Sequence, residues 1–150
     1  MNNQIDPNAL VIMNERFGCD TIISLATTEG ENPSVRMVNS YYENGSFYTV
    51  TYASSNKMKQ IAENPKVAVC GEWFTAHGTG ENLGHVRSGD NAEIMSKLRA
   101  VFAEWYDNGH TDENNPDTCV LRIRLTNGLL KSQGKKYFID FTSLSEEKRD

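Results

Sequence analysis

The residues best suited to chemistry in this sequence gather in one stretch, from Ser34 to Lys57. Arg36 offers planar, bidentate donors to a phosphate or to a carbonyl-rich ring, and Lys57 offers a compact positive charge. Ser55 precedes Lys57 where we expect a helix to begin, and free backbone N–H groups make a helix N-terminus a natural phosphate site. The stretch therefore predicts a site for a phosphorylated ligand, with a plain serine helix cap as the alternative.

A strand pair must position these side chains. The segment 34–42 alternates in polarity, which is typical of a strand and places Arg36 on one of its faces. Asn44 and Gly45 tolerate the positive φ of a tight hairpin turn, so the segment 46–52 returns antiparallel to it. The returning strand adds two hydroxyl side chains, Thr49 and Thr51.

The rest of the chain predicts a mainly β fold of the α+β class. We expect helices after Asp6-Pro7, after Ser54 or Ser55, and from Asp90 to Trp105, the last with an apolar stripe that forms core or a subunit contact. The expected strands are 21–27, 34–42, 46–52, 67–74, 119–126, 129–132 and 136–141, with a second hairpin at Asn127-Gly128. Mostly antiparallel neighbours predict a small antiparallel β-barrel with flanking helices, in a single domain over residues 1–150.

The glycine-rich segment between His77 and His85 invites comparison with a dinucleotide-binding loop. It lacks the following helix and the surrounding βαβ unit that such a loop requires. We expect this segment to be irregular, and to lie either over the ligand or only on the surface.

The spacing of the cysteine, histidine and serine residues supports neither a metal site nor a hydrolase. The sequence contains no C-x-x-C, H-x-x-x-H or H-E-x-x-H pattern, so we expect no metal site. It also lacks a G-x-S-x-G elbow and a local Cys-His signature, which argues against a hydrolase. The residues considered for a metal were His77, His85 and His110, together with the cysteines.

Composition narrows the class of protein further. A net charge of -5 over 150 residues disfavours a nucleic-acid binder, and no apolar run is long enough to span a membrane. The N-terminus has no signal-peptide pattern, so we expect a cytoplasmic protein. An odd number of cysteines, 3, favours reduced thiols, with Cys70 and Cys119 as small apolar residues inside strands.

Read together, these motifs resemble the FMN-binding split barrel of the pyridoxamine 5'-phosphate oxidase-like proteins. That family has R-x-V on one strand, a threonine at the end of the next, S-x-K at a helix start and N-P-x-V at the following strand. The matching motifs here are RMV at 36–38, YTVT at 48–51, SSNK at 54–57 and QIAENPKVAV at 60–69, followed by Trp73. The resemblance covers residues 21–74, and the later β segment 119–141 fits the same barrel.

The resemblance implies FMN as the cofactor and a homodimer with the flavin at the subunit interface. It places Arg36, Met37, Val38 and Asn39 along the isoalloxazine and phosphate edge, Val50 and Thr51 against the flavin, and Ser55, Asn56 and Lys57 around the phosphate. The sequence departs from the oxidases themselves, with Asn56 at a usual arginine and Tyr41 at a phosphate-binding lysine. The C-terminal tryptophan and arginines of the oxidases are absent, so the resemblance implies FMN binding without pyridoxamine phosphate oxidase activity.

The function implied is an FMN-dependent oxidoreductase acting on a small molecule and an electron donor that the sequence does not identify. FMN brings the redox chemistry, and no residue stands out as a catalytic acid or base. One alternative is a non-catalytic flavin-binding protein for storage or sensing, and another is a deazaflavin-dependent reductase. A nucleic-acid module with bases stacked on Tyr48 and Tyr52 is a third, which the acidic charge disfavours.

Overall fold

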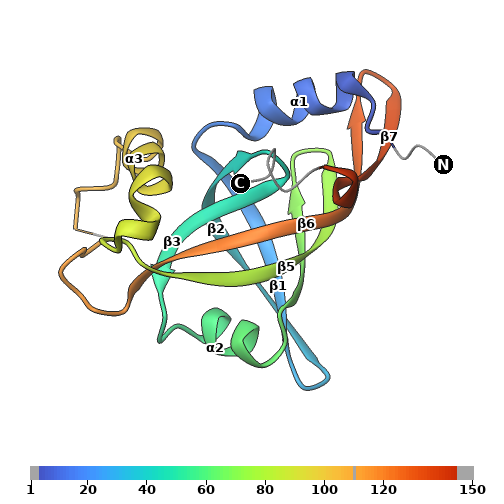
Figure 1. The fold of residues 1–150 in the computed structure, drawn as a ribbon. Coiled ribbons are helices and arrows are strands. Elements are labelled where there is room, and N and C mark those ends of the chain that lie inside the picture. The colour runs from blue at the N-terminus through green and yellow to red at the C-terminus, as the bar shows by residue number, and fades with distance from the viewer. Residues whose placement is uncertain (1–3, 110, 145–150) are drawn as a thin grey trace.

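A sheet of seven antiparallel strands forms the centre of the computed structural model, which describes residues 4–109 and 111–144 (Figure 1). The strand order is β3-β2-β1-β4-β5-β6-β7, and an additional pairing of β3 with β6 closes the sheet into a barrel. The strands are β1 Thr21–Glu29, β2 Asn32–Glu43, β3 Ser46–Tyr52, β4 Lys66–Gly71, β5 Phe74–His85, β6 Thr118–Ser132 and β7 Lys135–Asp140. The predicted antiparallel barrel with flanking helices is confirmed.

The barrel opens between β2 and β3. Their hairpin turns at Asn44 (φ 48°) and Gly45 (φ 85°), as predicted. The two strands pair only as far as Tyr41 opposite Tyr48. Beyond that point β2 continues along β1, whereas β3 continues along β6, so the neighbouring strands separate. This separation is the split of the barrel.

Two short helices cover the ends of the barrel (Figure 1). In α1, Pro7–Phe17, the side chain of Asp6 accepts a hydrogen bond from the backbone N–H of Asn8 (2.9 Å), and Gly18 is the C-cap, as predicted. The buried side chains of α1 are Ala9, Met13 and Phe17, and those of α2, Asn56–Glu63, are Met58 and Ile61. Each helix therefore closes one end of the apolar interior.

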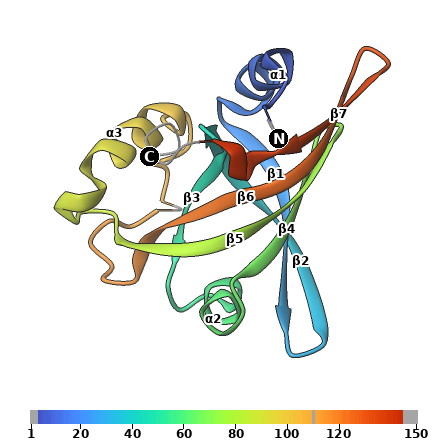
Figure 2. The same cartoon turned by 45° about the vertical axis from the view of Figure 1, so that its right-hand side comes forward.

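The third helix, α3, Ala92–Val101, lies outside the barrel (Figure 2). It buries Met95 and Leu98, together with Phe102, in a second apolar cluster that includes Val120 of β6. The apolar stripe is therefore core. The prediction that Asp90 caps a helix reaching Trp105 was wrong, because a 3-10 turn, η1 Gly89–Asn91, precedes α3 and turns follow Val101.

The glycine-rich segment is a strand, which corrects the prediction of an irregular connection. A Cβ at Gly78 would lie 2.7 Å from the carbonyl oxygen of Arg124, and one at Gly80 would lie 3.0 Å from Ile61. These glycines therefore allow β5 to approach β6 and α2 closely, which is a packing role. The expected strand 67–74 was also too long, because β4 ends at Gly71 and a turn at Trp73 (φ 52°) leads into β5.

The predicted hairpin at Asn127-Gly128 was wrong, because β6 runs through it without a break. The register between β5 and β6 shifts at His77/Gly78, which indicates a bulge where the turn was expected. The real hairpin lies at Gln133 (φ 50°) and Gly134 (φ 76°), and it leads into β7. The extra residue is Thr126, while Asn127 pairs with His77 and Gly128 pairs with Ala76, so pairing with β5 kept this dipeptide in a strand.

The three cysteines are free thiols. Cys119 and Cys70 both lie in strands as predicted, in β6 and β4, but only Cys119 is buried, and Cys70 is exposed. Within the described residues no three His, Cys, Asp or Glu side chains group as metal ligands, and His110 lies outside those residues. Across residues 4–109 and 111–144, no helix combines the length and the apolar character needed to cross a membrane.

Candidate functional site

A cavity of about 460 Å³ lies in the split between β2 and β3. Continuing the β2–β3 register past Tyr41 and Tyr48 would place Asn39 opposite Val50 and Val38 opposite Thr51. The cavity thus occupies the place where the two strands would otherwise have paired, and unpaired strand edges offer backbone donors and acceptors to a ligand. It is lined by Val38, Asn39, Thr49, Val50, Thr51, Lys57, Trp105, Asn108 and Thr111.

The structure brings together five of the nine residues predicted for cofactor binding, and these are Val38, Asn39, Val50, Thr51 and Lys57. The other four lie around the cavity without lining it. Met37 is 72% exposed and faces the side of β2 opposite to its neighbour Val38, because alternate residues of a strand face opposite sides. Ser55 is the N-cap of α2 and the exposed Asn56 is its first residue, directly before Lys57.

Arg36 points inward from β2 and crosses β1. Its Nη1 donates to the carbonyl oxygen of Leu25 (3.2 Å) and to Oγ1 of Thr27 (2.7 Å). The buried Thr27 hydroxyl in turn donates to Oε1 of Gln60 on α2. These bonds hold the guanidinium between β1 and the α2 end of the barrel, and burial lowers the pKa of Arg36.

The positive charges of Arg36 and Lys57 influence each other near the start of α2. Burial, and then the positive charge of Arg36, lower the pKa of Lys57. Neither side chain forms an ion pair with any carboxylate of the described residues. Neighbouring cations without a counter-charge favour an anion, because a bound anion offsets their mutual repulsion.

The helix start beside Lys57 supplies further donors. The Oγ of Ser55 is buried and has no hydrogen-bond partner in the part of the chain that the structure describes. The predicted capping bond from this side chain to the helix backbone is absent as well. Ser55 therefore has an unused hydrogen-bonding group within the described residues, and a phosphate group fits a site with this hydroxyl, two cations and a helix N-terminus.

Sequence reasoning missed the wall of the cavity that follows α3. Trp105, Asn108 and Thr111 line the split together with the strands. Nε1 of Trp105 donates to Oδ2 of Asp20 (2.7 Å), and Nδ2 of Asn39 donates to Oδ1 of the same carboxylate (3.2 Å). The end of the apolar stripe was the only sign of Trp105 in the sequence, and it indicated core or a subunit contact.

Glu113 anchors the far end of this wall. Its carboxylate accepts bonds from Nε and Nη2 of Arg99 (2.9 and 3.1 Å) and from the hydroxyl of Tyr106 (2.7 Å). Arg87 adds an ion pair at 3.6 Å. The hydrogen bonds from Arg99 are the main cause that lowers the pKa of Glu113, to about 2. The wall is therefore held to α3 by a charged cluster.

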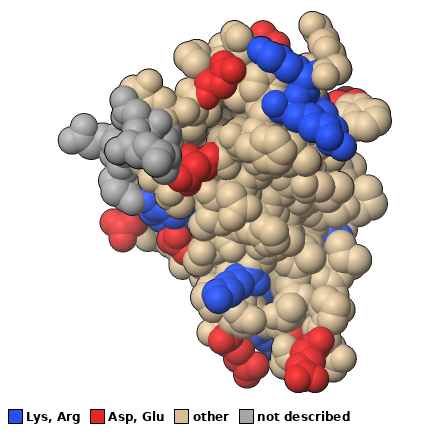
Figure 3. All heavy atoms as spheres, turned by 90° about the vertical axis from the view of Figure 1, so that its right-hand side faces the viewer, with Lys and Arg blue, Asp and Glu red and all other residues tan. Residues whose placement is uncertain are grey.

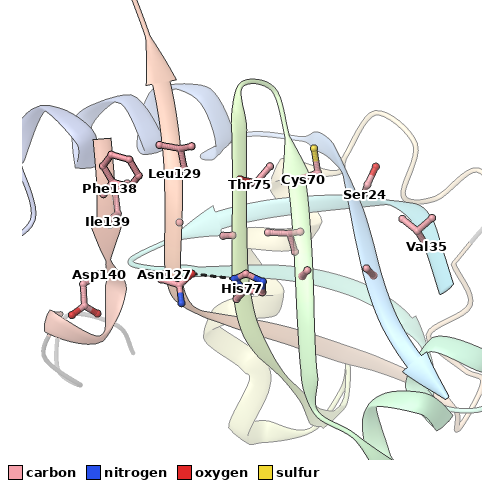
Figure 4. A pocket seen from close by; sticks show the side chains of 15 residues that line it. Ser24, Val35, Cys70, Thr75, His77, Asn127, Leu129, Phe138, Ile139 and Asp140 are labelled. Atoms are coloured by element: carbon pink, nitrogen blue, oxygen red, sulfur yellow. Dashed lines mark hydrogen bonds between the residues drawn. The ribbon is translucent and has the colours of Figure 1, made fainter. Parts of the chain in front are cut away.

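A second hollow, of about 660 Å³, lies on the outer face of the sheet. Figure 4 shows its side chains projecting from neighbouring strands, among them Val35, Cys70 and Phe138. Val35 is 69% and Phe138 81% exposed. The middle of the surface on the side away from α3 is largely uncharged (Figure 3). This face is an apolar sheet surface that no helix of the described chain covers.

The histidines of the glycine-rich segment lie away from the split cavity. Nδ1 of His77 is 3.1 Å from Oδ1 of Asn127 on the outer face (Figure 4). Nδ1 of His85 accepts the backbone N–H of Arg87, so its Nε2 carries the proton that bonds the carbonyl oxygen of Asn115 (3.0 Å). Neither histidine lines the split, so this segment does not lie over the expected ligand.

Comparison with known proteins gives one family match. A family model described as pyridoxamine 5'-phosphate oxidase matches residues 13–132. A comparison with curated protein sequences finds no match.

Several solved structures share the fold. A Clostridium acetobutylicum protein related to general stress protein 26, of the pyridoxinephosphate oxidase family, has 18% identity and a TM-score of 0.65, over 94% of this chain and 100% of its own. A NimC/NimA family protein from the same species has 21% identity and a TM-score of 0.63, over 87% and 94%. An FAD-binding protein from Mesorhizobium loti has 15% identity and a TM-score of 0.60, over 79% and 90%. Likeness at these identities establishes the fold alone.

Proposed function

Because the chain belongs to the pyridoxamine 5'-phosphate oxidase family, we propose that it is a flavoprotein that binds FMN in the split between β2 and β3. The observation that carries this proposal is the cavity at the missing strand pairing, beside which Arg36 and Lys57 have no ion pair within the described residues. A phosphorylated aromatic cofactor fits both features, because the strand edges suit a polar ring and the cations suit a phosphate.

The phosphate of FMN belongs at the start of α2 in this proposal. Lys57 and Arg36 supply its counter-charge, Ser55 Oγ donates a hydrogen bond, and the free backbone N–H groups from Asn56 onward add to it. The isoalloxazine ring lies along the separated strands, beside Val38 and Asn39 on one side and Val50 and Thr51 on the other. Met37 contributes only its backbone, since its side chain faces outward.

The proposed activity is that of an oxidoreductase. FMN supplies hydride or electron transfer when bound, and the protein supplies binding and electrostatics. The buried positive charges near the split stabilise negative charge on the cofactor. The substrate is a small molecule other than pyridoxamine phosphate, because the C-terminal tryptophan and arginines with which the oxidases recognise that substrate are absent from this sequence.

We propose that the protein is a homodimer and that a second copy covers the outer face of the sheet. Exposed Val35, Met37 and Phe138 form an apolar surface there, and apolar patches of this kind mark association sites. Met37 and Val38 are adjacent on β2, one facing this surface and the other the split. Pairing through β2 therefore brings the flavin site next to the subunit interface.

A visible absorption spectrum of the purified protein tests the cofactor. We expect the flavin bands either directly or after incubation with FMN and removal of the free ligand. A protein that stays colourless after this treatment contradicts the proposal. Riboflavin and FAD, offered in the same way, report whether the phosphate is required and whether a longer ligand is accepted.

Anaerobic stopped-flow mixing with NADH or NADPH then separates the oxidoreductase from a storage or sensing protein. Bleaching of the flavin bands by one of these donors, followed by reoxidation with an acceptor, supports turnover. Absence of bleaching with both nicotinamides favours the non-catalytic binder. Tight binding of a deazaflavin without binding of FMN favours the deazaflavin-dependent reductase.

A further inference from the structure

Trp105 occupies an unusual place for a residue at the end of an apolar helix stripe. It is half-buried and lines the split cavity, opposite the strands that carry Asn39 and Thr51. Its ring packs against Phe102 with centroids 4.8 Å apart, and Phe102 is fully buried in the second apolar cluster. The indole therefore rests on rigid core while it lines the cavity.

Asp20 links this indole to the opposite wall. One oxygen accepts Nε1 of Trp105 at 2.7 Å, and the other accepts Nδ2 of Asn39 at 3.2 Å. Both donors are neutral, and the ion pairs of the described residues do not include Asp20. A carboxylate that bonds one side chain on each wall fixes the separation of the two walls as well as the orientation of the indole.

The wall is also held at its other end. The hydroxyl of Tyr106, the neighbour of Trp105, donates a hydrogen bond to the Glu113 carboxylate. The same carboxylate accepts two hydrogen bonds from Arg99 of α3. Asn108 and Thr111 lie between these anchors and line the same cavity. A wall tied at both ends loses little conformational freedom when a ligand arrives, which is what a preformed binding site requires.

We propose that Trp105 is the aromatic wall against which the ring of the ligand packs, and that Asp20 is the positioning residue that holds the indole there. The proposal rests on flavin binding in the split. It assigns recognition of the planar ring to a segment that follows α3, separate from the phosphate groups at α2. These two recognition sites together define the class of ligand, which has a planar aromatic ring at one end and a phosphate at the other.

The two tryptophans of the chain make the proposal measurable. Trp73, the other one, is 68% exposed in the turn between β4 and β5. Trp73→Phe leaves Trp105 as the only tryptophan, and Trp105→Phe leaves Trp73. Titration of each variant with FMN then follows tryptophan emission and flavin emission in the same sample.

We expect FMN to quench the tryptophan emission of Trp73→Phe strongly and that of Trp105→Phe much less. Bound flavin should emit more brightly in Trp105→Phe than in Trp73→Phe, because an indole in contact with the ring quenches it by electron transfer. The affinity of Trp105→Phe for FMN should fall about 3- to 10-fold, as expected for loss of an aromatic contact.

Asp20→Asn tests the positioning role without removing the indole. One of its two acceptor contacts is replaced by an amide donor, so we expect brighter bound flavin with Trp105 still present. Asp107 is an exposed residue of the segment that carries Trp105. Asp107→Asn makes the same change of charge as Asp20→Asn and should leave the flavin emission unchanged. A merely structural role for Asp20 would lower the melting temperature and leave the emission per bound flavin as in the unchanged protein.

The outcomes separate the two proposals. If the unchanged protein fails to bind FMN, the proposed function fails and the aromatic wall fails with it. If FMN binds and its emission and affinity are the same in Trp105→Phe and Trp73→Phe, only the aromatic wall is wrong. If Trp105→Phe does not fold, Asp20→Asn decides the matter, and unaltered flavin emission in it overturns the positioning role.

Discussion

The split cavity and the outer hollow are built from the same sheet, yet their surfaces differ in kind. The split is bordered by two cations, several hydroxyl groups and unpaired strand edges, whereas the outer hollow is mainly apolar. Strand β2 contributes to both, because Val38 faces the split while Val35 and Met37 face outward. Asn39, on the same side of the strand as Met37, also lines the split, so the two surfaces adjoin along β2.

The two regions also differ in what holds them together. The outer face is formed by continuous ladders from β1 to β7, so its shape depends on backbone hydrogen bonds. The split is bounded by side-chain contacts of Asp20, Arg36 and Glu113. Substitutions should therefore act first on ligand affinity at the split and first on association at the outer face.

The largest effect is expected at the outer face, for Met37→Lys. A lysine placed in an apolar interface loses hydration without gaining a partner, so we expect the dissociation constant of the dimer to rise by about 100-fold or more. Sedimentation velocity over a range of concentrations measures this constant. Val11→Lys is the matched control, because Val11 is also an exposed apolar residue (52%) but belongs to α1. Equal dissociation of both variants, or of neither, would show that the outer face is not the interface.

The next effect is expected at the split, for Lys57→Ala. Loss of a charge-assisted hydrogen bond to phosphate should weaken FMN binding about 10- to 100-fold. Isothermal titration with FMN measures the affinity, and titration with riboflavin shows whether the loss depends on the phosphate. Lys59→Ala removes an exposed lysine from the same helix and should bind FMN normally. An unchanged affinity in Lys57→Ala would mean that the phosphate site has been misplaced.

The lowered pKa of Lys57 gives this site a pH dependence. Its folded-state pKa lies below 10.5, so the free protein begins to lose this charge at a lower pH than an ordinary lysine does. A phosphate dianion favours the charged lysine, hence binding takes up a proton and affinity falls as pH rises through the lowered pKa. We expect a fall of at most about tenfold per pH unit. FMN titrations between neutral and alkaline pH measure it, and a slope that persists in Lys57→Ala would assign it to another group.

The parts of the site that lie close together in the sequence were predictable. Strand alternation placed Arg36 on the inner side of β2, and Asn44-Gly45 fixed the hairpin that brings Val50 near Asn39. These features depend on local backbone preferences, which the residue types report directly. The antiparallel pairing of consecutive strands was likewise predictable, whereas the pairings of β1 with β4 and of β3 with β6 join strands that are distant in the sequence.

The remaining features depend on contacts between distant segments. Trp105 reaches the split only because α3 packs against Val120 and its neighbours, and an apolar stripe does not reveal that position. Asn127-Gly128 stayed inside a strand because β5 pairs with it, although the same dipeptide at 44–45 became a turn. The same Asn-Gly dipeptide therefore took two different conformations, and pairing with distant strands determined which one. A single sequence does not show that pairing.

A smaller effect is expected at the wall of the split, for Glu113→Gln. The pKa of Glu113 falls from 4.5 to about 2 on folding, so its ionised form stabilises the protein above about pH 4.5 and that contribution is lost as pH falls toward 2. We expect Glu113→Gln to lower the free energy of unfolding by roughly 1 to 2 kcal/mol at neutral pH, since its arginine partners are partly exposed. Urea unfolding at neutral and acidic pH measures the difference, which should vanish in acid. The exposed Glu104→Gln serves as its control, and an equal loss there would contradict the anchoring role.

The smallest effect concerns two thiols that belong to the two regions. Cys70 is exposed and lines the outer hollow, whereas burial raises the pKa of the Cys119 thiol to about 11, so Cys119 should not react near neutral pH. In a Cys19→Ser background, which removes the other exposed thiol, a thiol reagent reports on Cys70 alone. If a second copy covers the outer face, Cys70 should react several-fold faster in the Met37→Lys variant than in the dimer. Equal rates in the two proteins would place Cys70 outside the interface, and the partner would then have to bind another part of the apolar face.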